Sequence, residues 1–149
     1  MKLTSSAFAA NSRIPVRYTC DGANISPPLA WADPPTGTRS FALVCVDPDA
    51  PGGVWRHWAI YDIPAATHML AEHVPPARQL PPQAINDFRR PGYGGPCPPR
   101  GDAPHHYRFR LYALGVESLG PRTHCRDVEA AARSQALAVA ELSGLYQRG

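Results

Sequence analysis

The sequence Ser40-Phe41-Ala42-Leu43-Val44-Cys45-Val46-Asp47 decides the fold, because it is the strongest strand candidate in the chain. Its apolar run is continuous and does not alternate with polar residues, which predicts a strand that is covered on both faces. The run stops at Asp47-Pro48, and proline is excluded from the middle of a sheet. We therefore expect a central strand of a sandwich or packed sheet.

Two downstream segments predict further strands. Trp55–Ile63 follows the first strand after a short loop and is ended by Pro64. His106–Leu114 alternates apolar residues with arginines, which is typical of a half-exposed strand. Upstream, Ile14–Cys20 also alternates and predicts an edge strand that runs into a turn. The expected fold class is mainly β.

Only the end of the chain offers a good helix, because residues 122–149 contain no proline. Asp127 is a suitable N-cap, and apolar residues follow at rough helical spacing until Gly144. The sequence thus predicts one domain, residues 1–149, with a helical segment packed late in the chain.

The chain is rich in proline, with 18 prolines and 12 glycines in 149 residues. Typical usage of proline is about 5%, and this excess excludes a helical bundle. Half of the prolines lie between Pro75 and Pro104, an irregular region that is longer than most loops in compact domains. Loops of that length are typically functional or disordered.

Charge and hydropathy exclude two classes of partner. The 15 basic and 12 acidic residues leave a net charge of +3, and no stretch places four Lys or Arg together, so we expect no nucleic-acid partner. The first ten residues lack the apolar region of a signal peptide, and no window reaches the ~18 apolar residues of a membrane span. We expect a cytoplasmic protein.

The four cysteines, Cys20, Cys45, Cys97 and Cys125, form no CxxC pair, which argues against a zinc ribbon and a thioredoxin motif. Without a secretion signal, free thiols are expected. A bridge between loops, such as Cys20 to Cys97, stays open.

Several polar residues stand where a predicted strand meets a proline-stiffened loop. Asp47 ends the central strand, His57 begins the next, and His105 and Tyr107 follow the long loop. If these strands are neighbours, the side chains converge at one end of the sheet. Asp47 would then fix the tautomer of a histidine, while the few N–H groups that proline leaves, from Asp49, Ala50, Cys97 and Arg100, are candidate contacts for an anion.

A purely structural interpretation competes with this one. An Asp before Pro is commonly a turn residue, and a His beside Trp on a strand is commonly packed in a core. His105 and His106 are adjacent on a predicted strand, so only one of them can face a shared site.

Three blocks carry a family resemblance: Asp47-Pro48-Asp49-Ala50-Pro51, Trp55-Arg56-His57-Trp58, and Gly95–Gly101 followed by His105-His106-Tyr107. Together with Tyr18–Gly22, Asn24–Trp31 and Ala140–Tyr146, they span nearly the whole chain. The sequence resembles the phosphatidylethanolamine-binding protein family, and most of all its bacterial branch of Raf-kinase-inhibitor-like proteins.

The resemblance implies two packed antiparallel sheets, a Greek-key-like β-sandwich, with a C-terminal helical segment. It also implies a small pocket for phosphate, acetate or a phosphorylated head group. By position, the ligand-binding residues would be Asp47, Pro51, Trp55, His57, Cys97, Pro98, Pro99, His105 and Tyr107. His106 stands where eukaryotic relatives have Arg and should point away from the pocket.

These observations favour a non-enzymatic protein without a cofactor that binds a small anion or a phosphorylated head group; regulation of a kinase or protease partner stays open, as does a homodimer. The alternative is a metal- or thiol-dependent hydrolase that uses Asp47, His57, His105 or Cys97. Against it, the sequence has no HExxH motif, and prolines around Cys97 leave few N–H groups for an oxyanion hole. A third alternative is an interaction protein that binds through an exposed surface at Val74–Asn86.

Overall fold

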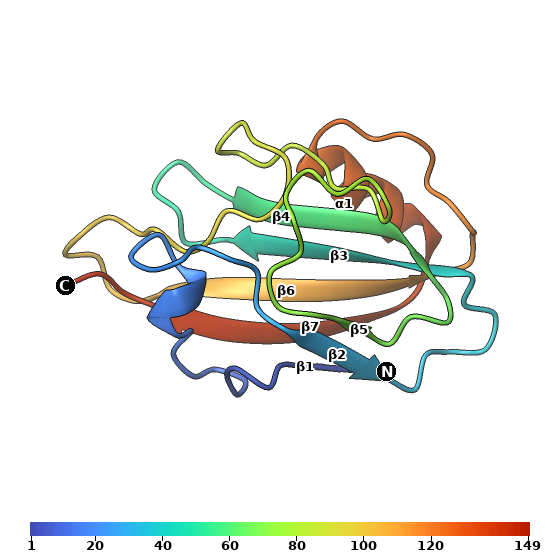
Figure 1. The fold of residues 1–149 in the computed structure, drawn as a ribbon, viewed down its shortest axis with the longest axis horizontal. Coiled ribbons are helices and arrows are strands. Elements are labelled where there is room, and N and C mark those ends of the chain that lie inside the picture. Colours follow the sequence, from blue (N-terminus) through green and yellow to red (C-terminus); the bar gives the residue numbers. More distant parts are fainter.

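The computed structural model covers residues 1–149 and contains two antiparallel sheets and one α-helix (Figure 1). The larger sheet has the strand order β4-β3-β6-β7 and the smaller has the order β1-β2-β5. The elements are β1 (Lys2–Thr4), β2 (Leu29–Ala32), β3 (Ser40–Asp47), β4 (Trp55–Pro64), β5 (Met69–Leu70), β6 (His105–Leu114), α1 (Cys125–Gln135) and β7 (Ala136–Tyr146). The predicted fold class, mainly β with two packed sheets and a helix late in the chain, is confirmed.

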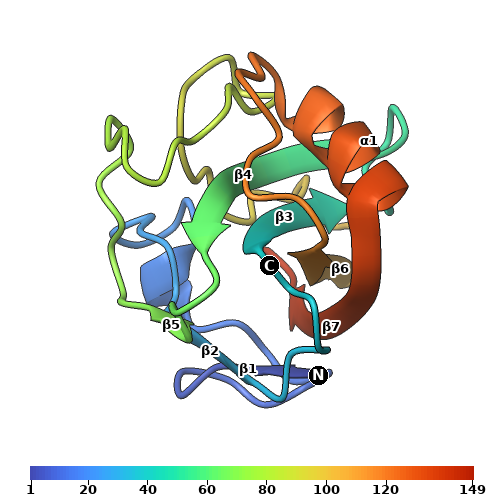
Figure 2. The same ribbon diagram turned by 90° about the vertical axis from the view of Figure 1, so that its right-hand side faces the viewer.

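Strand β3 is central, as its continuous apolar run predicts. All eight of its residues are buried, and it pairs with β4 on one side and β6 on the other. Phe41, Leu43 and Cys45 face the core between the sheets, whereas Val44 and Val46 face a second core beneath α1. Figure 2 shows α1 on the opposite side of the larger sheet from β1, β2 and β5. Because both faces are covered, the strand is apolar between its two ends, where buried Ser40 and Asp47 are both hydrogen-bonded.

The predicted edge strand at Ile14–Cys20 is wrong. Residues Val16–Tyr18 form a single 3₁₀ turn, in which the Tyr18 N–H donates to the Pro15 carbonyl. The following residues continue as turns, with the Thr19 N–H on the Val16 carbonyl and the Gly22 N–H on the Thr19 carbonyl. These local bonds satisfy the backbone, so the alternating side chains find no strand partner.

The predicted helix is too long. It begins at Cys125, with His124 and not Asp127 at the N-cap, and ends at Gln135. From Ala136 the chain pairs with β6 over its whole length. Here exposed Leu137, Val139 and Glu141 alternate with better-covered neighbours, which is the two-residue period of a strand. The many alanines make this period hard to recognise in the sequence. Sheet pairing thus overrides the helix propensity of alanine.

Strand β6 is also better covered than predicted. It starts one residue earlier, at His105, and β3 and β7 pair with it from both sides. His106 is its one exposed residue, while Arg108 and Arg110 are half-buried. The helix that packs near this strand is short, and no helix of the structure is long and apolar enough to cross a membrane.

Candidate functional site

A cavity of about 200 Å³ lies where the carboxyl end of β3 meets the first residues of β4 and β6. Antiparallel pairing places these three strand ends at the same edge of the sheet, and loops close the cavity. Its lining residues are Asp47, Ala50, Pro51, Trp55, His57, Phe88, Cys97, Pro98, Pro99, His105 and Tyr107. The structure therefore brings all nine predicted site residues together around one cavity; that they bind a ligand stays a prediction.

His105 lies between two carboxylates. Its Nδ1 is 2.7 Å from Asp47 Oδ2, and its Nε2 is 3.0 Å from Asp102 Oδ2. Burial of the ring disfavours the imidazolium, but the hydrogen bonds to Asp47 and Asp102 outweigh it, and the pKa of His105 is raised. With both nitrogens protonated, each donates to a carboxylate. The charge of buried Asp47 is thereby balanced within the site.

His57 is held differently. Its Nδ1 lies 2.6 Å from the Gly94 carbonyl, and the Gly94 N–H donates to the His57 carbonyl at 3.0 Å. Burial lowers the pKa of His57, although the Gly94 carbonyl and Asp47 partly oppose this. The neutral ring therefore donates Nδ1–H to Gly94, and Nε2 is the nitrogen left for a ligand.

The hydroxyl of Tyr107 is buried and has no hydrogen-bond partner. The ring packs edge-on against His57, with the centroids 5.3 Å apart. Burial raises the pKa of Tyr107, and the nearby charge of Asp47 raises it further. The phenol therefore stays protonated. Buried polar groups are nearly always paired, which makes this unpaired O–H the exception to explain in the cavity wall.

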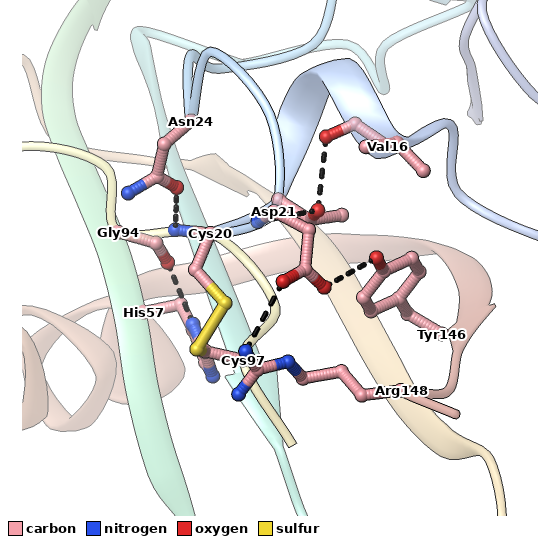
Figure 3. Close-up of a disulfide and its surroundings, with 11 residues drawn as sticks. Val16, Cys20, Asp21, Asn24, His57, Gly94, Cys97, Tyr146 and Arg148 are labelled. Atoms are coloured by element: carbon pink, nitrogen blue, oxygen red, sulfur yellow. Dashed lines mark hydrogen bonds and ion pairs between the residues drawn. A yellow bond between two sulfur atoms is a disulfide. The ribbon is translucent and has the colours of Figure 1, made fainter. Parts of the chain in front are cut away.

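The loop Gly94–Pro99 forms one wall and is tied to the segment after the 3₁₀ turn (Figure 3). The Cys20 N–H donates to the Pro96 carbonyl at 3.1 Å, and the Gly95 N–H donates to Asn24 Oδ1 at 2.8 Å. Gly95 lies so close to the Tyr18 carbonyl and Asn24 that a Cβ would clash there.

A disulfide joins Cys20 to Cys97, so the expectation of free thiols is wrong for these two residues. Cys45 and Cys125 are free and buried. The loop contacts explain the pairing, because they bring two segments 77 residues apart in sequence into register.

His106 points away from the cavity, as the alternation along the strand predicts. It is exposed, and its backbone N–H and Nδ1 both contact Asp49 Oδ2, at 2.8 and 2.7 Å. The Asp49 N–H, a predicted anion donor, instead donates to Asp47 Oδ1 at 2.8 Å. This pair therefore braces the loop beside the site.

Sequence reasoning missed two residues around the site. Phe88 lines the cavity and packs edge-on against both Trp55 and His57. Asp102 holds the outer nitrogen of His105, and its place three residues before that histidine was the available signal. Phe88 had no signal, because it lies in an irregular loop with no periodicity.

The hydrolase alternative finds no support in this arrangement. Cys97 carries no free thiol, because it is bonded to Cys20. The His, Cys, Asp and Glu side chains form no group of three or more that could hold a metal ion. Of the ring nitrogens in the site, only Nε2 of His57 lacks a protein partner.

A family model described as "Phosphatidylethanolamine-binding protein" matches residues 4–147. A "UPF0098 protein" of Aquifex aeolicus is 49% identical, with 99% of this chain and 89% of that protein covered. One of the same name from Methanothermobacter thermautotrophicus is 50% identical, with both chains fully covered. The crystal structure of Escherichia coli YbcL, described as a new member of the mammalian PEBP family, matches with a TM-score of 0.91 at 34% identity and covers 99% of this chain and 98% of that one. The chain therefore belongs to the phosphatidylethanolamine-binding protein family.

Proposed function

We propose that this protein is a non-enzymatic binding protein for a small anion or a phosphorylated head group, held in the cavity of about 200 Å³. The observation that carries the proposal is the buried, unpaired hydroxyl of Tyr107, whose ring packs edge-on against that of His57. An unsatisfied buried donor destabilises the empty site, and an acceptor oxygen on a ligand would satisfy it.

The size and walls of the cavity support a small ligand. Pockets for drug-sized molecules measure ~300–1,000 Å³, so about 200 Å³ suits phosphate, acetate or a head group better than a whole lipid. Prolines and the rings of Trp55 and Phe88 supply much of the lining. Such walls exclude water and strengthen each hydrogen bond to the ligand.

The protonation states favour a ligand that shares a proton with the site. Neutral His57 presents an acceptor at Nε2, and Tyr107 presents a donor. A protonated phosphate or acetic acid could donate to His57 and accept from Tyr107. A fully ionised anion would instead bind with uptake of a proton by His57.

Isothermal titration of the purified protein with phosphate, phosphorylethanolamine and acetate tests the proposal. We expect saturable binding of at least one of them, and its loss in His57→Ala. NMR titration detects weaker binding as shifts of His57 and Tyr107. If wild type shows neither heat nor shifts with any of the three, the cavity is not an anion site.

A phosphorylated side chain on a partner protein would present the same group as a head group. A phosphoserine peptide is therefore a second probe, and inorganic phosphate should displace it. A pull-down with and without phosphate would separate a kinase or protease partner that uses the cavity from one that uses another surface.

A further inference from the structure

The Cys20–Cys97 disulfide is both accessible and part of the cavity wall. Cys97 is exposed and lines the cavity, and Cys20 is half-buried. The other two cysteines are buried in the two cores, where burial raises the pKa of Cys45 and brings that of Cys125 to about 12. Thiol chemistry from solution is therefore directed to this disulfide.

Residues 97–100 depend on the disulfide for their attachment. No hydrogen bond and no ion pair joins Cys97, Pro98, Pro99 or Arg100 to another segment of the chain. The Pro99 carbonyl accepts only a local bond, from the Asp102 N–H at 3.2 Å. Two prolines remove two possible donors. Between two flanking hydrogen bonds, from the Cys20 N–H to the Pro96 carbonyl at 3.1 Å and from the Gly101 N–H to the Arg148 carbonyl at 3.5 Å, the stretch that supplies three cavity-lining residues is thus tied by one covalent link and by packing.

Basic side chains surround the other end of the disulfide. Asp21, next to Cys20, pairs with Arg148 at 3.1 Å and accepts from the Tyr146 hydroxyl at 2.7 Å (Figure 3). The Tyr146 hydrogen bond is the main cause of the lowered pKa of Asp21, and the charges of Arg148 and Arg100 lower it further. Two guanidinium groups against one carboxylate leave a positive surplus beside Cys20, which favours an attacking anionic thiol and a departing thiolate.

We propose that Cys97 is a site of thiol–disulfide exchange with small acidic thiols, and that opening the Cys20–Cys97 bond weakens the anion site. A thiolate attacks Sγ of Cys97, the bond to Cys20 breaks, and Cys20 leaves as a thiolate that takes a proton from water. The product is a mixed disulfide on Cys97, at the cavity wall. A second thiolate attacks the external sulfur, releases Cys97 as a thiolate and forms the oxidised external disulfide. Two external thiols thereby supply the two electrons.

The exposure of Cys97 selects it over Cys20 as the attacked sulfur. After opening, only the flanking residues Pro96 and Gly101 keep hydrogen bonds to other segments, so residues 97–100 between them sample conformations that do not close the cavity. If about a tenth of the molecules keep the closed wall, the apparent affinity falls about tenfold. This second part rests on the proposed function, whereas the exchange at Cys97 does not.

The test incubates the native protein with glutathione over a range of reduced-to-oxidised ratios, followed by alkylation and peptide mass spectrometry. We expect a glutathione adduct on Cys97 and no modification of Cys45 or Cys125. Glutathione ethyl ester, which lacks one carboxylate, should react more slowly, and the difference should shrink in 1 M salt. A disulfide that opens only after denaturation, or an adduct confined to Cys20, would overturn the exchange at Cys97.

Phosphate titration of the oxidised and reduced forms tests the coupling, with about tenfold weaker binding expected after reduction. A Cys125→Ala variant should show the same redox response, since that residue lies under α1. Equal affinity in both forms overturns the coupling. If neither form binds phosphate, phosphorylethanolamine or acetate, the proposed function fails, while the adduct on Cys97 still decides the exchange.

Discussion

The molecule has two cavities in proline-rich surroundings, and the larger is the less equipped for binding. A groove of about 490 Å³ is lined mostly by residues of Met69–Pro82, and none of its side chains holds a buried polar atom without a hydrogen-bond partner. Glu72 accepts from Arg17 and Tyr18, and Arg78 Nε donates to the Leu80 carbonyl at 2.7 Å. The smaller cavity holds the buried, unpaired hydroxyl of Tyr107. The unsatisfied buried hydroxyl is therefore the difference that favours the smaller cavity as the candidate site.

A disulfide holds one wall of the smaller cavity, whereas no disulfide holds the larger groove. Removal of the disulfide should therefore have the largest effect on stability. The Cys20–Cys97 link closes a loop of 77 residues, and such links typically contribute ~2–4 kcal/mol. The double variant Cys20→Ser with Cys97→Ser should lose about that much free energy of unfolding in urea titrations.

The matched control for the disulfide lies in the larger groove. Leu80 is 81% exposed, and Leu80→Ser should change the unfolding free energy by no more than about 0.5 kcal/mol. An equal effect of the two changes would mean that both walls are held by packing alone.

The second prediction concerns the unpaired hydroxyl. Tyr107→Phe keeps the ring and its contact with His57 but removes the donor, and a hydrogen bond to a charged ligand contributes ~1.5–3 kcal/mol. Phosphate affinity by calorimetry should fall roughly 10- to 100-fold, while stability stays the same or rises, because an unsatisfied group is removed. Leu80→Ser should leave the affinity unchanged. The reverse result would move the site to the larger groove.

Part of the smaller cavity could be predicted from the sequence. The convergence of Asp47, His57 and Tyr107 was predictable because each lies near the end of a strand that meets a proline-rich loop, and antiparallel pairing brings those three ends to one edge of the sheet. The continuous run from Ser40 likewise predicted the central strand correctly.

The errors came from interactions between segments distant in sequence. Ala136–Tyr146 has a helical composition, but β6 offers it a complete row of backbone partners. Cys20 and Cys97 are paired by loop contacts that no local pattern encodes. Phe88 and Asp102 reach the site only through the path of the long loop.

The third prediction uses pH, with sulfate as the probe because its charge is constant between pH 5 and 8. The pKa of His57 is lowered by burial, so the free ring is neutral near pH 7 and must take up a proton to donate to sulfate. Affinity should rise as pH falls, by at most about tenfold for each pH unit, and level off below the pKa of free His57. The charges of Asp47 and Asp87 raise the pKa of this ring, and Tyr107 packs against it, while the hydrogen bonds from His105 to Asp47 and Asp102 raise the pKa of His105.

A variant separates His57 from its neighbours in that experiment. His57→Gln keeps a polar side chain but has no titratable group, so its sulfate affinity should be nearly independent of pH over the same range. A slope that persists in His57→Gln would show that His57 is not the group that takes up the proton.

The smallest effect is expected at Asp102, whose side chain is 40% exposed. The raised pKa of His105 stabilises the fold below about pH 6.5, the value of a free imidazole, and this contribution is lost as pH rises through the folded pKa. Asp102→Asn should therefore cost less than about 1 kcal/mol at pH 6, and the cost should be smaller at pH 9, in urea titrations. The stability that the hydrogen bonds of Glu72 contribute at the larger groove depends on pH in the opposite direction. The Arg17 and Tyr18 contacts lower the pKa of Glu72 to about 2, so Glu72→Gln should lose stability at pH 6 and pH 9 alike. Equal pH profiles for the two variants would show that His105 is not charged between its carboxylates.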